Sequence, residues 1–309
     1  MDTAYLSAAI ADSRQVCPTP HQRTVDTDTN YGHTVSIMND GNSQRQLYET
    51  VDDVKVHYQR SGDGQPLLLL HGSTSSLEHF DRATDILDKH FDVIRPDLPG
   101  FGLTGARNDR DYRIRTYART VAGFMAQLGI DRYAIAGNSL GGNVAWNLTL
   151  DYPDRVRALV LVNATGYPEK ALPLGMRLAR NPAVAQLMRR AMPRRMVEGG
   201  LRQAVGPQST IVDDAMVDRV HRLWNHNGNR GAFVDFVNTD QPDRTAELGR
   251  IRVPTLVLRS ASIDGQHFAR DIPHARQAVN PDTGHLLPEE DPDWFTEQVI
   301  GFLSTLPRN

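Results

Sequence analysis

Short apolar runs alternate with amphipathic stretches along most of this chain. Residues 114–128 place apolar side chains at helical spacing, and residues 140–153 have a similar helical composition. The apolar runs have the length of buried strands and read "QPLLLLHG", "FDVIRPDLPG", "DRYAIAGNS", "RVRALVLVNA" and "VPTLVLRS". Apolar strands that alternate with amphipathic helices predict an α/β fold, with a mostly parallel central sheet and helices on both of its faces.

The pattern of apolar and polar residues changes at two places, and these changes guide the predicted domain layout. Residues 46–62 alternate apolar and polar positions around Asp52 and Asp53, which indicates a hairpin. Residues 166–246 carry helical pieces without a convincing strand, so we expect a helical lid inserted after the sixth strand of the sheet. The predicted layout is an N-terminal extension at 1–45, a core formed by 46–165 and 247–309, and a lid (cap) at 166–246.

Composition narrows the function classes. The net charge of −3 provides no basic field for nucleic acid, and no apolar run approaches the ~20 residues of a membrane span. Cys17 is the one cysteine, so no intramolecular disulfide is possible, and Asp2 stands where a signal peptide carries positive charge. We therefore expect a cytoplasmic protein that binds neither nucleic acid nor membrane, with an oligomeric state that the sequence leaves open.

The segment "IAGNSLGG" places Ser139 between two glycines, after a predicted strand and before a predicted helix. A G-x-S-x-G element in this context is typical of a nucleophile elbow, in which a sharp turn presents the serine hydroxyl above the sheet. Gly137 and Gly141 fit this reading, because the turn packs these positions against the flanking strand and helix. Ser139 is the candidate nucleophile.

Two further segments complete the candidate chemistry. "HGSTSS" follows an earlier strand, where the backbone N–H of Ser73 could join that of Leu140 to bind the oxyanion of a tetrahedral intermediate. "TGHLLPEEDP" supplies His285 before the final predicted helix, after the serine in the order Ser, acid, His. A catalytic triad with His285 as the base is the expectation.

These motifs resemble those of the α/β-hydrolase superfamily over residues 46–306. "HGSTSS", "DLPGFGLTG", "GNSLGG", "YPDRVRALVLVNATGYP", "VPTLVL" and "TGHLLPEEDP" match its landmarks in order. The resemblance implies an α/β-hydrolase fold with a helical lid, and it is closest to the serine esterases and the carbon–carbon-bond hydrolases. Haloalkane dehalogenases and epoxide hydrolases place Asp where this chain has Ser139, which argues against both of those activities.

The acid of the triad is where the chain departs from that family. After "PTLVL", relatives have a Trp-Gly-type turn and an Asp, whereas Ile263 stands at the expected position here and Asp264 follows one residue later. We expect the loop to absorb this shift, so Asp264 is the predicted acid, with Asp271 and Asp282 as the next candidates. Some relatives carry the acid after the preceding strand, where this chain has Asn163.

The predicted lid suggests how a substrate would be held. Met176, Trp224 and Phe233 are candidate substrate-binding residues, although packing inside the lid is the more common role of such residues. Residues 166–205 contain eight Lys and Arg against two Glu. One of these arginines could bind a substrate carboxylate, although a solvated helical face is the simpler interpretation.

The expected function is that of a serine hydrolase that cleaves small carboxylic esters through an acyl-enzyme. The alternatives are hydrolysis of a carbon–carbon bond in a vinylogous diketone, and a ligand-binding, non-hydrolytic protein whose acid position has degraded. The mechanism requires no cofactor, and scattered His and Asp residues show no metal-ligand spacing. The predicted partner is a small-molecule ester, with or without a carboxylate.

Overall fold

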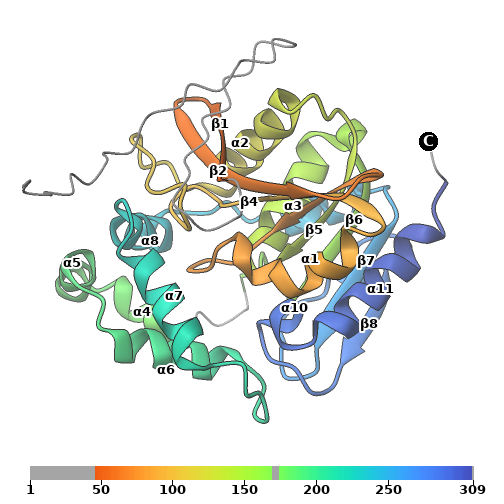
Figure 1. Ribbon diagram of the computed structural model, residues 1–309. Coiled ribbons are helices and arrows are strands. Elements are labelled where there is room, and N and C mark those ends of the chain that lie inside the picture. The colour runs from red at the N-terminus through yellow and green to blue at the C-terminus, as the bar shows by residue number, and fades with distance from the viewer. Residues whose placement is uncertain (1–45, 169–173, 308–309) are drawn as a thin grey trace, which may run out of the picture. The chain divides into compact units, whose positions relative to one another are not determined.

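An eight-stranded sheet organises the structure, a computed structural model that describes residues 46–168 and 174–307 (Figure 1). The strands are β1 (Leu47–Val51), β2 (Val54–Ser61), β3 (Gln65–Leu70), β4 (Phe91–Pro96), β5 (Tyr133–Asn138), β6 (Val156–Val162), β7 (Thr255–Ser260) and β8 (Arg276–Asn280). Their order is β1-β2-β4-β3-β5-β6-β7-β8, and β2 pairs antiparallel with β1 and β4 while all other pairs are parallel. The predicted mostly parallel sheet is confirmed. The extension predicted at residues 1–45 lies outside the described residues.

The β1–β2 hairpin turns at the pair of aspartates that the sequence indicated. Asp52 and Asp53 have φ of 46° and 62°. Positive φ at both central residues is the geometry of a type I′ two-residue hairpin turn, which matches the twist of the flanking strands.

The buried strands explain why helices cover both faces of the sheet. Along β3, Leu67 and Leu69 join one apolar core, whereas Leu68 and Leu70 join the other. The first core is closed by α1 (Asp81–Leu87), α10 (Leu287–Glu290) and α11 (Pro292–Ser304). The second is closed by α2 (Ile114–Gln127), α3 (Leu140–Asp151) and α9 (Phe268–Asp271). Because side chains alternate along a strand, a strand buried on both faces reads as a continuous apolar run.

A group of helices, the lid, leaves the sheet between β6 and β7, where the sequence analysis predicted it (Figure 1). It consists of α4 (Leu174–Ala179), α5 (Pro182–Arg190), α6 (Arg194–Ala204), α7 (Asp214–Trp224) and α8 (Asn229–Asn238). Helix α5 packs on α4 and α8, and α6 packs on α7. Short 3-10 helices occur at Leu77–Phe80, Pro153–Arg155 and Thr245–Arg250. None of the helices in the described ranges is long and apolar enough to cross a bilayer.

Candidate active site

Ser139 occupies the sharp turn between β5 and α3. Its backbone has φ 55° and ψ −113°, a strained combination that costs roughly 1–3 kcal/mol. The Ser139 N–H donates to the carbonyl of Val162 at 3.0 Å, and the Ser139 carbonyl accepts the N–H of Thr165 at 3.1 Å. These bonds to β6 and the residues after it hold the turn in its strained shape. The sequence context of a strand, a serine and a helix predicted this geometry.

The glycines beside Ser139 are required by space. A Cβ atom placed on Gly137 would lie 2.3 Å from the backbone carbon of Gly141. A Cβ atom on Gly141 would lie 2.1 Å from the carbonyl oxygen of Leu70. Any side chain at either position would push β5, α3 and β3 apart and displace Ser139.

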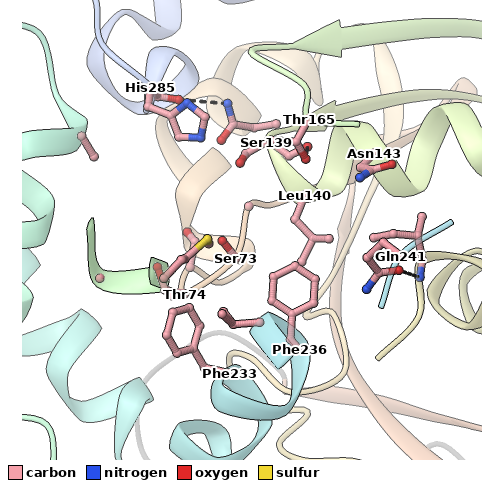
Figure 2. Close-up of a pocket in the computed structure, with 18 of the residues that line it drawn as sticks. Ser73, Thr74, Ser139, Leu140, Asn143, Thr165, Phe233, Phe236, Gln241 and His285 are labelled. Carbon is pink, nitrogen blue, oxygen red and sulfur yellow. Dashed lines mark hydrogen bonds between the residues drawn. The ribbon is translucent and has the colours of Figure 1, made fainter. Parts of the chain in front are cut away.

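The turn after β3 passes directly beside the serine. A Cβ atom on Gly72 would lie 3.2 Å from the Cβ of Ser139. Ser73 follows and lines the same cavity as Ser139 and Leu140 (Figure 2). Leu140 is the first residue of α3, where backbone N–H groups have no partner within the helix. The two residues predicted to bind an oxyanion are thus brought to one wall of the cavity.

A buried, neutral histidine, His71, hydrogen-bonds to the backbone of this turn. The Nε2 atom of His71 accepts the N–H of Leu98 at 2.9 Å, so the proton is on Nδ1, which donates to the carbonyl of Gly72 at 2.7 Å. The ring is completely buried, and burial lowers the pKa of His71 despite the nearby charge of Asp97. An uncharged imidazole therefore fixes the position of Gly72.

Asp97 is a buried support of the site that the sequence analysis did not single out. Its carboxylate accepts the N–H groups of Leu77 and Leu103 at 2.7 and 2.8 Å, and His57 Nδ1 lies 2.7 Å away. Burial alone would raise the pKa of Asp97, but the hydrogen bond to His57 and the hydrogen bond from the Leu103 N–H outweigh it and keep the pKa below its usual value. Because Asp97 holds Leu77, it anchors the far end of the segment that contains Ser73. The sequence signal that could have identified this residue is the motif "DLPGFGLTG", which begins with Asp97.

His285 reaches the same end of the cavity as Ser139 (Figure 2). The Nδ2 atom of Asn138, the residue before the serine, donates to the His285 carbonyl at 3.0 Å. Asn163 Nδ2 and Ser260 Oγ both donate to the Gly284 carbonyl, at 3.1 and 2.6 Å. Neutral side chains at the ends of three neighbouring strands therefore hold the backbone of the loop that carries His285.

The structure differs from the sequence prediction at Asp264. Its side chain is 96% exposed, and its Oδ1 atom lies 3.4 Å from Arg259 Nη1. The loop after β7 turns at Gly265, with φ 77°, and places Ile263 in the cavity wall instead. The one-residue shift is therefore not absorbed by the loop. Asp264 is not brought together with Ser139 and His285.

Neither of the two other candidate acids lines the cavity that contains Ser139 and His285. The carboxylate of Asp271 accepts the Tyr167 hydroxyl at 2.7 Å and pairs with Arg270, and Asp282 is exposed. Asn163, at the alternative acid position, has φ 42° and is buried. Its amide is engaged with Ser260 and with the carbonyl of Gly284.

The cavity between core and lid has a volume of about 1360 Å³. Its floor contains Ser139, and Met176, Trp224 and Phe233 lie in its wall as predicted. Four more methionines line it: Met188, Met192, Met196 and Met216. Apolar lid side chains above a polar floor fit a substrate that has one polar reacting group and an apolar body.

Several lid arginines are neutralised by neighbouring carboxylates. Arg189 pairs with Asp235, Arg194 pairs with Asp214 and Asp218, and Arg202 pairs with Glu198. Arg180 lines the cavity and forms no ion pair within the described residues. No cluster of three or more His, Cys, Asp or Glu side chains suited to a metal ion occurs in the described part of the chain.

Comparisons with known proteins agree with this fold. The family model of the alpha/beta hydrolase fold matches residues 65–292. A 2-hydroxy-6-oxononadienedioate/2-hydroxy-6-oxononatrienedioate hydrolase of Burkholderia vietnamiensis is 30% identical over 83% of this chain and 93% of the relative. An uncharacterized hydrolase of Bacillus subtilis, YugF, is 27% identical over 82% of this chain and 96% of its own length. A thermophilic esterase from Thermogutta terrifontis superposes with a TM-score of 0.70 at 26% identity, covering 82% of this chain and 94% of the esterase. The chain therefore belongs to the alpha/beta hydrolase fold family.

Proposed function

We propose that this protein is a serine hydrolase that cleaves small carboxylic esters through an acyl-enzyme formed on Ser139. One observation carries the proposal: a serine in a strained turn lies on the floor of a large cavity, with His285 at the same end and the Ser73 and Leu140 turns on the wall. Strain of this kind persists where the surrounding structure enforces it, and it is concentrated at functional sites.

The proposed reaction proceeds in two similar halves. His285 takes the proton of Ser139 as the hydroxyl oxygen attacks the ester carbonyl, and the N–H groups of Ser73 and Leu140 stabilise the oxyanion. The imidazolium then protonates the leaving alcohol. Water attacks the acyl-enzyme in the same way, releases the acid and restores Ser139.

The position of His285 in this proposal depends on its loop. Because the Asp264 carboxylate faces solvent, we leave Asp264 out of the catalytic set. Hydrogen bonds from Asn138, Asn163 and Ser260 hold the backbone of this loop. They support the position from which the His285 side chain extends.

The substrate is proposed to have an apolar body. The lid methionines, Trp224 and Phe233 provide an adaptable apolar wall, and the cavity is large enough for an acyl chain or an aromatic alcohol. A cytoplasmic location, and a small-molecule ester as the partner, belong to the same proposal.

Hydrolysis of a carbon–carbon bond is the second candidate, and a specific observation favours it. Relatives with 26–30% identity are named hydrolases of 2-hydroxy-6-oxo dienoates, and Arg180 at the cavity wall offers a guanidinium for a substrate carboxylate. Such a substrate must first ketonise, which introduces a solvent proton next to the bond that is cleaved.

A substrate panel distinguishes the candidates. Nitrophenyl esters of short and medium acyl chains are compared with a 2-hydroxy-6-oxo dienoate, using the parent and Ser139→Ala. We expect the parent to hydrolyse esters and Ser139→Ala to lose activity to background. Turnover of the dienoate in D₂O, with deuterium beside the cleaved bond and no ester turnover, would favour the second candidate. Equal ester turnover by the parent and Ser139→Ala would contradict the proposal.

A further inference from the structure

The loop that carries His285 is bound to the lid as well as to the core. The backbone N–H of His285 donates to the carbonyl of Ala204, the last residue of α6, at 2.5 Å. Ala204 is 81 positions earlier in the chain. The base of the proposed mechanism is thus hydrogen-bonded directly to the lid.

One carboxylate ties the two segments together. Glu290 Oε1 accepts the N–H of Gly284 at 2.9 Å, and Glu290 Oε2 accepts the N–H of Gly206 at 2.7 Å. Gly284 precedes His285, and Gly206 lies between α6 and α7. Each oxygen of one side chain therefore binds one of the two backbones.

The two backbones meet without room for side chains. A Cβ atom on Gly206 would lie 2.4 Å from the Asp282 carbonyl oxygen, and one on Gly284 would lie 2.3 Å from the backbone carbon of Val205. On the other side of the base, Leu286 packs against a lid cluster that contains Val212, Met216 and Val217. The residues immediately before and after His285 therefore both contact the lid.

We propose that Glu290 is a positioning residue for hydrolysis. It joins the α6–α7 junction of the lid to the His285 loop, so that the base is in place only while that junction is docked. This inference rests on the proposed function of Ser139 and His285. Glu290 acts through the backbone of Gly284 and touches no substrate. The side-chain amides of Asn138 and Asn163 hold the carbonyls of the loop, whereas the lid carbonyl of Ala204 accepts the N–H of His285.

The substitution Glu290→Gln tests this role. An amide has one acceptor oxygen, so one of the two buried N–H groups loses its partner while the shape of the side chain is kept. We expect kcat for nitrophenyl esters, and the rate of Ser139 labelling by a fluorophosphonate, to fall about tenfold or more with KM within about twofold of the parent. Glu297→Gln, which removes one exposed negative charge from α11, is the matched control and keeps parental rates.

A second variant disturbs the same junction from the lid side. Gly206→Ala drives a methyl group into the Asp282 carbonyl and leaves Glu290 intact. If both act by undocking one junction, the double variant loses no more activity than the worse single variant. Losses that multiply in the double variant would overturn the proposal, as would parental labelling and kcat in Glu290→Gln.

Hydrogen exchange reads the same contact without any substrate. We expect faster exchange in Glu290→Gln in the peptides that contain residues 204–206 and 283–286, with the rest of the sheet unchanged. Unchanged exchange in both peptides would overturn the proposal even for a protein that turns over no ester. If Glu290→Gln exchanges faster than the parent but the fluorophosphonate does not label the parent, the proposed function is contradicted instead.

Discussion

Replacing Asp264 with asparagine should leave catalysis almost unchanged. The carboxylate is 96% exposed, its ion partner Arg259 lies at 3.4 Å, and the neighbouring Ile263 is the residue that faces the cavity. An exposed pair of this kind contributes at most about 1 kcal/mol to stability. Removal of the acid from a working serine triad, by contrast, lowers kcat about 10⁴-fold.

The expected result for Asp264→Asn is a kcat/KM for nitrophenyl esters within about twofold of the parent and a melting temperature within about 2 °C. Initial rates across a range of ester concentrations, with a thermal melt of each variant, measure both quantities. His285→Ala provides the scale of the assay, with an expected loss of at least about 10³-fold. A loss of 100-fold or more in Asp264→Asn, at parental melting temperature, would refute the placement of this loop.

Three further changes test the supports of the site. Gly141→Ala should destabilise the fold by about 1–3 kcal/mol and lower kcat/KM about 10²-fold, because its methyl group would meet the Leu70 carbonyl oxygen at 2.1 Å. Urea unfolding measures the first quantity and ester kinetics the second. Asp97→Asn should cost about 3 kcal/mol in urea unfolding, since a buried charged acceptor is lost. Burial alone would raise the pKa of Glu289, but the hydrogen bond to His79 and the charge of Arg219 lower it below the usual 4.5. Ionised Glu289 therefore stabilises the fold above that pH, and this contribution is lost as the pH falls through the lowered pKa. Arg219→Met should therefore show a shallower loss of stability below about pH 4.5 than the parent in urea titrations at stepped pH, and an unchanged slope would count against this ion pair.

Local signals in the sequence predicted the sheet and the nucleophile turn well. The buried parts of β3, β5 and β6 are mainly apolar runs, and the glycines beside Ser139 mark a turn whose backbones approach within a side chain's width. The lid was predicted from the loss of strand pattern after Thr165. Helix α6 is harder to recognise in the sequence, because Gly199 and Gly200 lower its helix propensity.

Contacts between distant segments could not be predicted in the same way. The orientation of Asp264 is set in a loop that turns at Gly265, and no local pattern in the sequence reports which side chain of that loop faces the cavity. The bridge from Glu290 to the lid joins residues 84 positions apart. The role of Asp97 likewise requires the loop after β4 to wrap around its carboxylate, which a strand pattern does not indicate.

Labelling by a fluorophosphonate probe, followed by peptide mass mapping, tests the central claim most directly. Such a probe reacts with a serine whose hydroxyl is activated by a base, so the parent should be labelled stoichiometrically on the peptide that contains Ser139. Ser139→Ala should not be labelled, and His285→Ala should be labelled at least about 10²-fold more slowly. A parent protein that is folded but unlabelled, or that is labelled equally after His285→Ala, would contradict the assignment of Ser139 and His285 as nucleophile and base.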